Sequence, residues 1–151
     1  MALSANELRI GNFVNVLMYK CDGYEIYQIS EIRKYAISDV NDLSFQYESV
    51  EPIPLTEEWL LKFGFEKCNT SRIITSYSKS ISWSGGDYKT ISVCPDLGNQ
   101  YIYLRHGELN GSRDDDNLIC IFNGDVNGAL YVHGLQNLYF ALNGKELTIK
   151  T

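Results

Sequence analysis

Alternation of apolar and polar residues dominates the first 55 residues of the chain and predicts short β strands. The segments 13–20 and 24–32 are rich in β-branched and aromatic side chains, and Asp22-Gly23 between them is a strong signal for a hairpin turn. Two further strand-like segments, 34–40 and 43–50, are separated by Asn41-Asp42. Several short strands with few helical signals indicate a small β sheet, either curled and open or closed as an SH3-like barrel.

Helical spacing first appears at residue 56, after two prolines. Thr56 is a good N-cap, and the two glutamates that follow it suit the positive end of the helix dipole. Gly64 is placed where glycine commonly ends a helix. The residues expected on the packed stripe of this short helix are Trp59, Leu60 and Phe63.

From about residue 72 to residue 132 the pattern predicts an antiparallel β meander. Ile81 and Trp83 are expected on one face of the sheet with Ile91 and Val93, and serines are expected on the opposite, solvated face. The strands expected to follow are 100–106, 118–124 and 129–133.

A second helix is expected near the end of the chain, because large apolar residues recur at helical spacing after residue 134. His133-Gly134 is then interpreted as the corner between the last strand and this helix, since glycine permits a sharp change of direction. Gly144 is expected to end the helix. The stripe expected on the packed face comprises Leu135, Leu138, Tyr139 and Leu142.

These patterns together predict an α+β protein with an N-terminal β sheet or barrel, an antiparallel meander and two short packed helices. The expected division is a β subdomain at residues 1–55 and a helix–meander–helix subdomain at residues 56–151. One continuous domain is the alternative, because 151 residues fit either arrangement.

Charge and hydropathy restrict the partners and the location. The chain has a formal net charge of −6 and a pI near 4.8. Its 13 basic residues are scattered, whereas a nucleic-acid surface needs clustered Lys and Arg, so nucleic acid is not expected as a partner. No apolar run approaches the ~20 residues that span a bilayer, and the first residues lack the pattern of a signal peptide. We therefore expect a cytoplasmic protein without a membrane partner.

The four cysteines are widely separated and include no C-x-x-C pair, which argues against a zinc site. In a reducing compartment they are expected to be buried thiols that behave as small apolar residues. They are Cys21, Cys68, Cys94 and Cys120. We expect neither a metal nor a cofactor.

Three segments of the chain carry a resemblance to a known family. They are ELRIGNFVNV at 7–16, EPIPLTEEWLLKFGFEK at 51–67 and YVHGLQNLYFALNGKELTIK at 131–150. The chain resembles a widespread family of small uncharacterised proteins from gut anaerobic bacteria and their phages and prophages. That family usually has Gln where this chain has Gly134, which weakens any role for a side chain at this position. The resemblance implies a phage or mobile-element accessory protein, and it implies no mechanism.

No segment carries a recognisable catalytic or metal-binding motif. The aspartates within 112–117 (SRDDDN) are consecutive and point in different directions, so they indicate a solvated loop rather than a cation site. His106 and His133 are the only candidates for acid–base chemistry, and no nucleophile or carboxylate motif accompanies them. The sequence therefore predicts no catalytic residue and a protein that is not an enzyme.

Tyrosine placement is the most suggestive feature. Tyr101, Tyr103 and Arg105 are expected on one strand face, and Tyr131 and His133 on one face of another strand. If the two strands were neighbours, they would form an aromatic surface with the composition of protein-binding hot spots. The alternative is that these tyrosines cover a sheet edge or pack under the C-terminal helix.

Three functional hypotheses follow. The first is a non-enzymatic binding or adaptor protein that contacts a host or phage protein through the five residues above. The second is sequestration of a small anionic ligand such as a signalling nucleotide, because aromatic rings with Arg and His nearby suit a base and a phosphate. The third, a hydrolase or transferase that uses His106 or His133, requires a carboxylate or thiol within hydrogen-bond reach of the imidazole.

Overall fold

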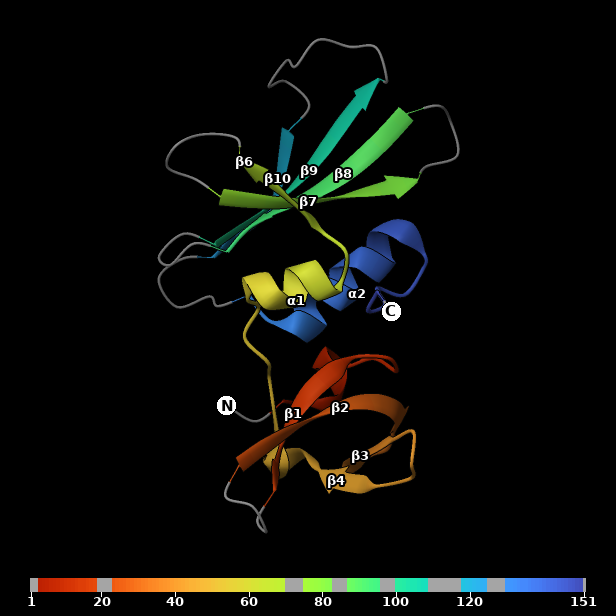
Figure 1. Cartoon of the computed structure of the whole chain (residues 1–151). Coiled ribbons are helices and arrows are strands. Elements are labelled where there is room, and N and C mark those ends of the chain that lie inside the picture. The colour runs from red at the N-terminus through yellow and green to blue at the C-terminus, as the bar shows by residue number, and fades with distance from the viewer. Residues whose placement is uncertain are drawn as a thin grey trace. The chain divides into compact units, whose positions relative to one another are not determined.

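The computed structural model in Figure 1 describes residues 3–18, 23–69, 75–82, 87–95, 100–108, 118–124 and 130–150. Within these ranges the chain forms two antiparallel five-stranded sheets and two α helices, so the predicted α+β class is confirmed. Contacts divide the chain into two compact units. The N-terminal unit contains Met1–Pro54 and Tyr131–Leu147, and the meander unit contains Leu55–Leu130 and Thr148–Thr151.

The sheet of the N-terminal unit is curled. Strands β1 to β4 pair in sequence order, and β5 pairs with β1. Its strand order is β4-β3-β2-β1-β5, so the last strand comes back to pair with the first. A short 3-10 helix precedes β1 and another precedes β5. The strands are β1 Phe13–Met18, β2 Gly23–Ile32, β3 Ala36–Asp39, β4 Ser44–Gln46 and β5 Val50–Glu51, and the 3-10 helices are η1 Ala5–Glu7 and η2 Tyr47–Ser49.

Alternation along the strands produces the core of this unit, as predicted. Val14 and Val16 on β1 are 0% and 1% exposed, while their neighbours along the strand remain half-buried. They cluster with Ile29, Ile37 and Val50 from the other strands. Burial of one such side chain stabilises the folded state by about 1.5–3 kcal/mol, which explains why five short strands hold together.

The predicted hairpin between the first two strands is confirmed. β1 and β2 pair in antiparallel register from Phe13↔Gln28 to Met18↔Gly23. Gly23 is therefore already the first residue of β2, and Asp22 lies outside the described residues. β2 then bulges after Ile29 and pairs with β3.

Helix α2, Val132–Asn143, completes the N-terminal unit rather than the meander unit. The first amide of the helix is bonded to the segment that follows β5, because the Val132 N–H donates to the Ile53 carbonyl at 3.0 Å. Figure 1 shows the helix lying over β1 and β2. The expected division at residue 55 grouped this helix with the meander, and the structure groups it with the first sheet.

The start of α2 corrects the prediction for residues 129–133. Among the described residues of this range, only Tyr131 pairs as a strand residue, in an isolated bridge to Pro54, and the helix begins at Val132. His133 and Gly134 lie inside the helix, so they are not a strand-to-helix corner. The prediction placed the start of the helix too late, because the buried residues at helical spacing begin at Val132 and not at Leu135. The fully or nearly buried side chains of α2 are Val132, His133, Leu135, Gln136 and Tyr139.

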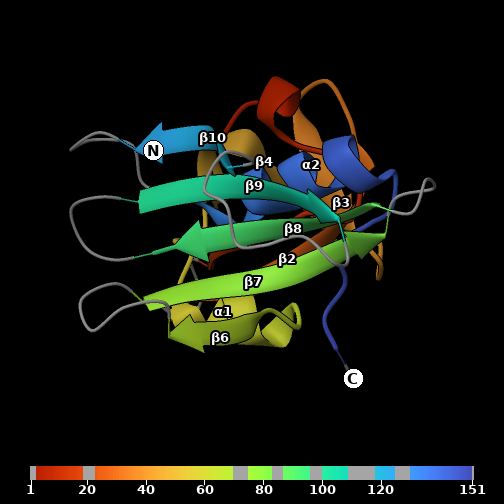
Figure 2. The same ribbon diagram turned by 90° about the horizontal axis from the view of Figure 1, so that it is seen from above.

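The meander unit is a consecutive antiparallel sheet with order β10-β9-β8-β7-β6, as Figure 2 shows. This confirms the predicted meander. Helix α1, Glu57–Lys62, precedes it and lies against one face of the sheet (Figure 1). The strands are β6 Glu66–Asn69, β7 Thr75–Ser82, β8 Asp87–Cys94, β9 Gln100–Glu108 and β10 Leu118–Gly124.

Helix α1 confirms the sequence prediction in its extent and its packing. Thr56 is the N-cap residue, although its side chain makes no capping hydrogen bond, and the chain turns at Gly64 with φ of 74°. Leu60 and Phe63 are 0% exposed and Trp59 is 7% exposed. The stripe read from the sequence is therefore the stripe that packs.

One face of the meander sheet is apolar and the other is small and polar. The register places Ile91 opposite Leu104 and Val93 opposite Ile102, and all four side chains are at least nine-tenths buried. On β7 the buried Tyr77 and Ile81 alternate with serines. The predicted partition of this sheet into an apolar and a hydroxyl-bearing face is thus confirmed for the described side chains, whereas Trp83 lies outside the described residues. None of the described helices is long and apolar enough to cross a membrane.

Two glycines of α2 are expected to respond to alanine in opposite directions. Gly134 is the third helical residue and open space surrounds the position of its missing Cβ, so alanine should raise the stability by about 1 kcal/mol and the melting temperature by about 2–4 °C. Gly144 ends the helix with φ of 66°, so alanine there should cost about 1–2 kcal/mol. Thermal unfolding of the two single variants tests this. Equal shifts would contradict the helical assignment of Gly134.

Candidate functional site

Two of the five predicted site residues form a stacked pair on β9. The rings of Tyr101 and Tyr103 lie with centroids 5.8 Å apart and planes inclined by 26°. Both side chains are half-buried, whereas Ile102 and Leu104 between and beyond them are buried. The predicted separation of tyrosines and aliphatic residues onto opposite faces of β9 is therefore confirmed.

Small hydroxyl side chains surround this pair on the same sheet face. Ser92 of β8 is opposite Tyr103, and Ser78 of β7 is opposite Ser92. The hydroxyls of Ser78 and Ser92 hydrogen-bond at 2.8 Å. Because these side chains are short, the tyrosine rings are the tallest groups described on this face. We call the set Ser78, Thr90, Ser92, Tyr101 and Tyr103 the tyrosine–serine face.

Arg105 continues the same strand two residues after Tyr103. Its backbone pairs with Thr90 of β8 and with Leu118 of β10. Alternation along a strand would place its side chain on the face of Tyr103, but that side chain lies outside the described part of the structure, so its placement stays a prediction.

Tyr131 and His133, the other two predicted residues, lie at the start of α2 in the N-terminal unit. Their rings are stacked, with centroids 5.8 Å apart and an angle of 12°. Tyr131 caps the helix and His133 is inside it, so they do not lie on a strand that extends the sheet of Tyr101 and Tyr103. The expectation that Tyr131 and His133 share one face of a strand is therefore wrong.

His133 is a buried imidazole, with 7% of its surface exposed. Its Nδ1 atom has no hydrogen-bond partner among the described residues. Burial lowers the pKa of His133 below its ordinary value, and the carboxylate of Glu7 opposes this shift more weakly. A neutral imidazole packed on a tyrosine ring fits an interior role better than acid–base catalysis.

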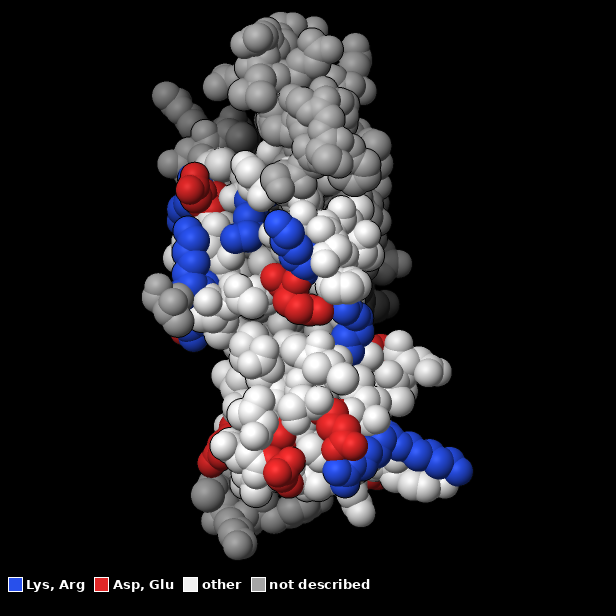
Figure 3. All heavy atoms as spheres, turned by 90° about the vertical axis from the view of Figure 1, so that its right-hand side faces the viewer, with Lys and Arg blue, Asp and Glu red and all other residues white. Residues whose placement is uncertain are grey.

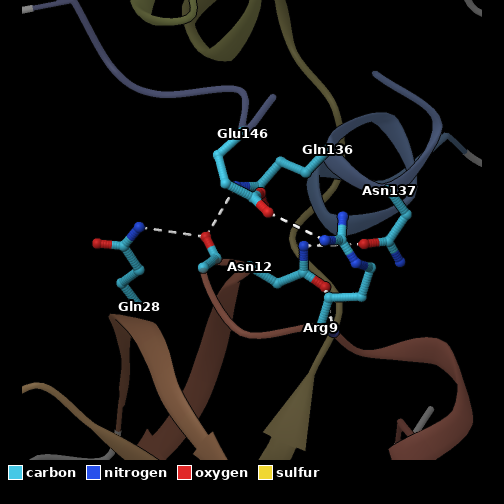
Figure 4. Close-up of polar contacts among 7 residues, drawn as sticks. Arg9, Asn12, Gln28, Gln136, Asn137 and Glu146 are labelled. Atoms are coloured by element: carbon cyan, nitrogen blue, oxygen red, sulfur yellow. Dashed lines mark hydrogen bonds and ion pairs between the residues drawn. The ribbon is translucent and has the colours of Figure 1, made fainter. Parts of the chain in front are cut away.

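Sequence reasoning missed a buried polar network that joins α2 to the turn before β1 (Figure 4). Asn12 is 0% exposed and Gln136 is 1% exposed. The Gln136 Oε1 atom accepts from the Phe13 N–H at 2.9 Å, and its Nε2 atom donates to the Gly11 carbonyl at 2.9 Å. Asn12 donates from Nδ2 to Asn137 Oδ1 at 3.0 Å. We call Gly11, Asn12, Phe13, Gln136 and Asn137, joined by these bonds, the Asn12–Gln136 network.

Charged groups flank the network at its exposed side. Arg9 pairs with Glu146 at 3.0 Å, and its guanidinium carbon lies 3.4 Å from the centroid of the Phe140 ring. The backbone N–H of Arg9 donates to Asn12 Oδ1 at 2.8 Å, so the residue that carries the ion pair is also bonded to one of the buried amides. Because Arg9 and Glu146 are partly exposed, the ion pair itself contributes little, and its main effect is to orient the turn.

The sequence signal for this network was present but not decisive. Its members fall in ELRIGN and LQN, which belong to two of the segments that carry the family resemblance. Asparagine and glutamine in such segments are usually surface residues, so their burial could be found only from the pairing of two distant segments.

The other candidate groups offer no assembled chemistry among the described residues. The acidic segment 112–117, which the sequence predicts to be a solvated loop, lies outside them. Cys68 and Cys94 are free thiols, half-buried and buried. No group of three or more His, Cys, Asp or Glu side chains that could hold a metal ion occurs in the described ranges.

Charge on the described surface is mixed in sign. On the face shown in Figure 3, acidic and basic side chains alternate, and neither sign forms a continuous patch there. That face therefore lacks the clustered positive charge that a nucleic-acid backbone requires.

Comparison with protein-family models, curated proteins and solved structures finds no match to this chain.

Removal of one buried amide should weaken the attachment of α2. Asn12→Ala deletes the acceptor of the Arg9 N–H and the donor to Asn137, so we expect a loss of about 2–3 kcal/mol in the free energy of unfolding. Urea unfolding measures the loss, and hydrogen exchange should show faster exchange of the α2 amides. Gln46→Ala, at an exposed position of β4, is the matched control. An unchanged unfolding midpoint for Asn12→Ala would refute the role of the network.

Protonation of His133 should destabilise the fold. Its pKa is lowered in the folded state, so below the unfolded value of about 6.5 the unfolded chain binds more protons and stability falls as the pH decreases. The loss should begin near pH 6.5 and should vanish in His133→Phe, which keeps an aromatic ring beside Tyr131. Urea midpoints between pH 7.5 and pH 5 measure it, and His106→Asn is the control that should retain the loss. A flat profile for the unmodified protein would contradict the assignment.

Proposed function

We propose that the protein is a non-enzymatic binding or adaptor protein that contacts a protein partner through the tyrosine–serine face. The observation that carries the proposal is the stacked pair of Tyr101 and Tyr103 on a sheet face of small hydroxyl side chains.

The pair is suited to recognition because it is ordered before a partner arrives. Tyrosine offers a large apolar ring with a polar tip and few rotatable bonds, so binding costs little side-chain entropy. Stacking further restricts both rings. Arg105, two residues along the same strand, would add a charged group of the type enriched in binding hot spots.

The biological setting of the proposal follows from the family resemblance. A phage or mobile-element accessory protein that acts in the bacterial cytoplasm would contact a host or phage protein. The acidic net charge of −6 and the mixed charge in Figure 3 favour a protein partner over nucleic acid.

A small anionic ligand is the competing occupant. That alternative has less support, because His133, one of the two cationic groups it invokes, is buried at the start of α2. Arg105 would then be the one cationic group left of the predicted set.

The double variant Tyr103→Ala/Arg105→Ala should lose the partner and keep the fold. Affinity capture with the tagged protein from host lysate, quantified by mass spectrometry, should show one specific partner that the variant fails to enrich. The melting temperature should fall by no more than about 4 °C, because Tyr103 is only half-buried. Tyr35→Ala, at a position 71% exposed in the other unit, is the matched control and should capture normally.

Two outcomes would count against this function. Equal capture by the double variant would place the contact elsewhere. Thermal stabilisation by a nucleotide, about 2.7 kcal/mol at one hundred times its Kd, would favour the anionic ligand if the double variant abolished it.

A further inference from the structure

Strand β2 has an unpaired stretch at its N-terminal half. It pairs with β1 along Gly23–Gln28, but its pairing with β3 begins only at Ile29. No described strand lies on the other side of Gly23–Gln28. This leaves one free edge of six residues inside a five-stranded sheet.

The backbone groups of three residues point out of this edge. The Ile29 N–H donates to the Asn12 carbonyl at 2.9 Å, and the Ile29 carbonyl accepts from the Gly11 N–H at 2.7 Å, so both groups of Ile29 face the β1 side. Antiparallel pairing alternates along a strand. The N–H and C=O groups of Tyr24, Ile26 and Gln28 therefore face away from β1.

Apolar side chains are exposed beside these groups. Tyr24 and Ile26 are 51% and 52% exposed, on the same face of the strand. The turn between β3 and β4 follows Asp39, which pairs with Ile29, so it lies at the end of the free edge. Val40 in that turn is 71% exposed.

Apart from the charge of Glu25, the edge lacks the features that usually prevent strand addition. Such edges are typically very short, or carry lysine, proline or a bulge. The strands at the two ends of this sheet, β4 and β5, are three and two residues long and fit that rule. The free half of β2 contains neither lysine nor proline, and its bulge lies beyond it, between Ile29 and Glu31.

One acidic side chain lies on the edge itself, and the whole unit is acidic. Glu25 is exposed and accepts a hydrogen bond from the Tyr27 hydroxyl at 2.7 Å. The Tyr24 hydroxyl hydrogen-bonds to Glu51 of β5. The N-terminal unit as a whole has nine acidic and five basic residues. A complementary strand would be basic, and a second copy of the chain would bring two acidic units together.

We propose that the free edge of β2 at Tyr24, Ile26 and Gln28 accepts an extended basic segment of a partner protein as an additional β strand. Main-chain hydrogen bonds supply the affinity of strand addition, and alternate side chains supply its specificity. Apolar residues of the segment pack on Tyr24 and Ile26, and its Lys or Arg residues on the other face pair with Glu25. The surface is separate from the tyrosine–serine face and does not depend on the function proposed above.

The probe is a displayed library of 12-residue peptides, selected on the immobilised full-length protein. Enriched peptides should alternate apolar residues with Lys or Arg, and their affinity should fall at high salt. Ile26→Pro removes one outward N–H while the bonds to β1 remain, since proline is tolerated at sheet edges. Fluorescence polarisation with a labelled enriched peptide should show a dissociation constant at least about tenfold higher for this variant, equal to about 1.4 kcal/mol.

Ile26→Lys provides a second test that keeps the backbone intact, and it should weaken the same peptide by adding a like charge. Tyr35→Ala in the same unit and Tyr103→Ala in the other unit should bind normally. Circular dichroism verifies that each variant is folded. Three outcomes would overturn the proposal: no enriched peptide, equal binding by Ile26→Lys, or a dimer of the unmodified protein that Ile26→Lys dissociates.

Discussion

Satisfaction of two buried amides, Asn12 and Gln136, is the constraint on which the N-terminal unit depends. They lie 124 positions apart in the chain, and each is almost fully removed from water. A buried amide without a partner costs about 1–3 kcal/mol, so a shift of α2 that broke the bonds of Asn12 and Gln136 would be unfavourable. An apolar stripe alone would tolerate a shift along the helix axis. The polar bonds fix the register, and the apolar contacts supply most of the stabilisation.

The local patterns of the chain predicted its elements well, because each depends on neighbours in sequence. Alternation identified the strands, and Thr56 with its apolar stripe identified α1. The grouping of α2 with the first sheet depends on contacts between residues more than 120 positions apart, such as Asn12 with Asn137. Periodicity carries no information about such pairs. The start of α2 was misjudged for a different reason, since Val132 suits a strand by residue type. The helix shows only in the bond from the Leu135 N–H to the Tyr131 carbonyl, which the sequence does not reveal.

The candidate surfaces divide in the same way. That Tyr101 and Tyr103 share a face follows from the two-residue repeat of any strand, and the structure adds their stacking. Tyr131 and His133 were assigned to a strand by residue type alone, whereas the structure places Tyr131 at the N-cap of α2 and His133 inside the helix. The free edge of β2 was not predictable from β2 itself. It exists because β3 is only four residues long and reaches back no further than Ile29.

The two proposed surfaces recognise different things, and this difference bears on what an adaptor of this size can do. The tyrosine–serine face presents side chains, so it selects a partner by shape and by the position of aromatic contacts. The edge of β2 presents main-chain groups, which any extended segment can satisfy, so its selectivity must come from the side chains beside it, Tyr24, Glu25 and Ile26. Each compact unit carries one of the two surfaces. Loss of one surface should therefore leave the other intact, which is the behaviour that distinguishes an adaptor with two contacts from a protein with one extended site.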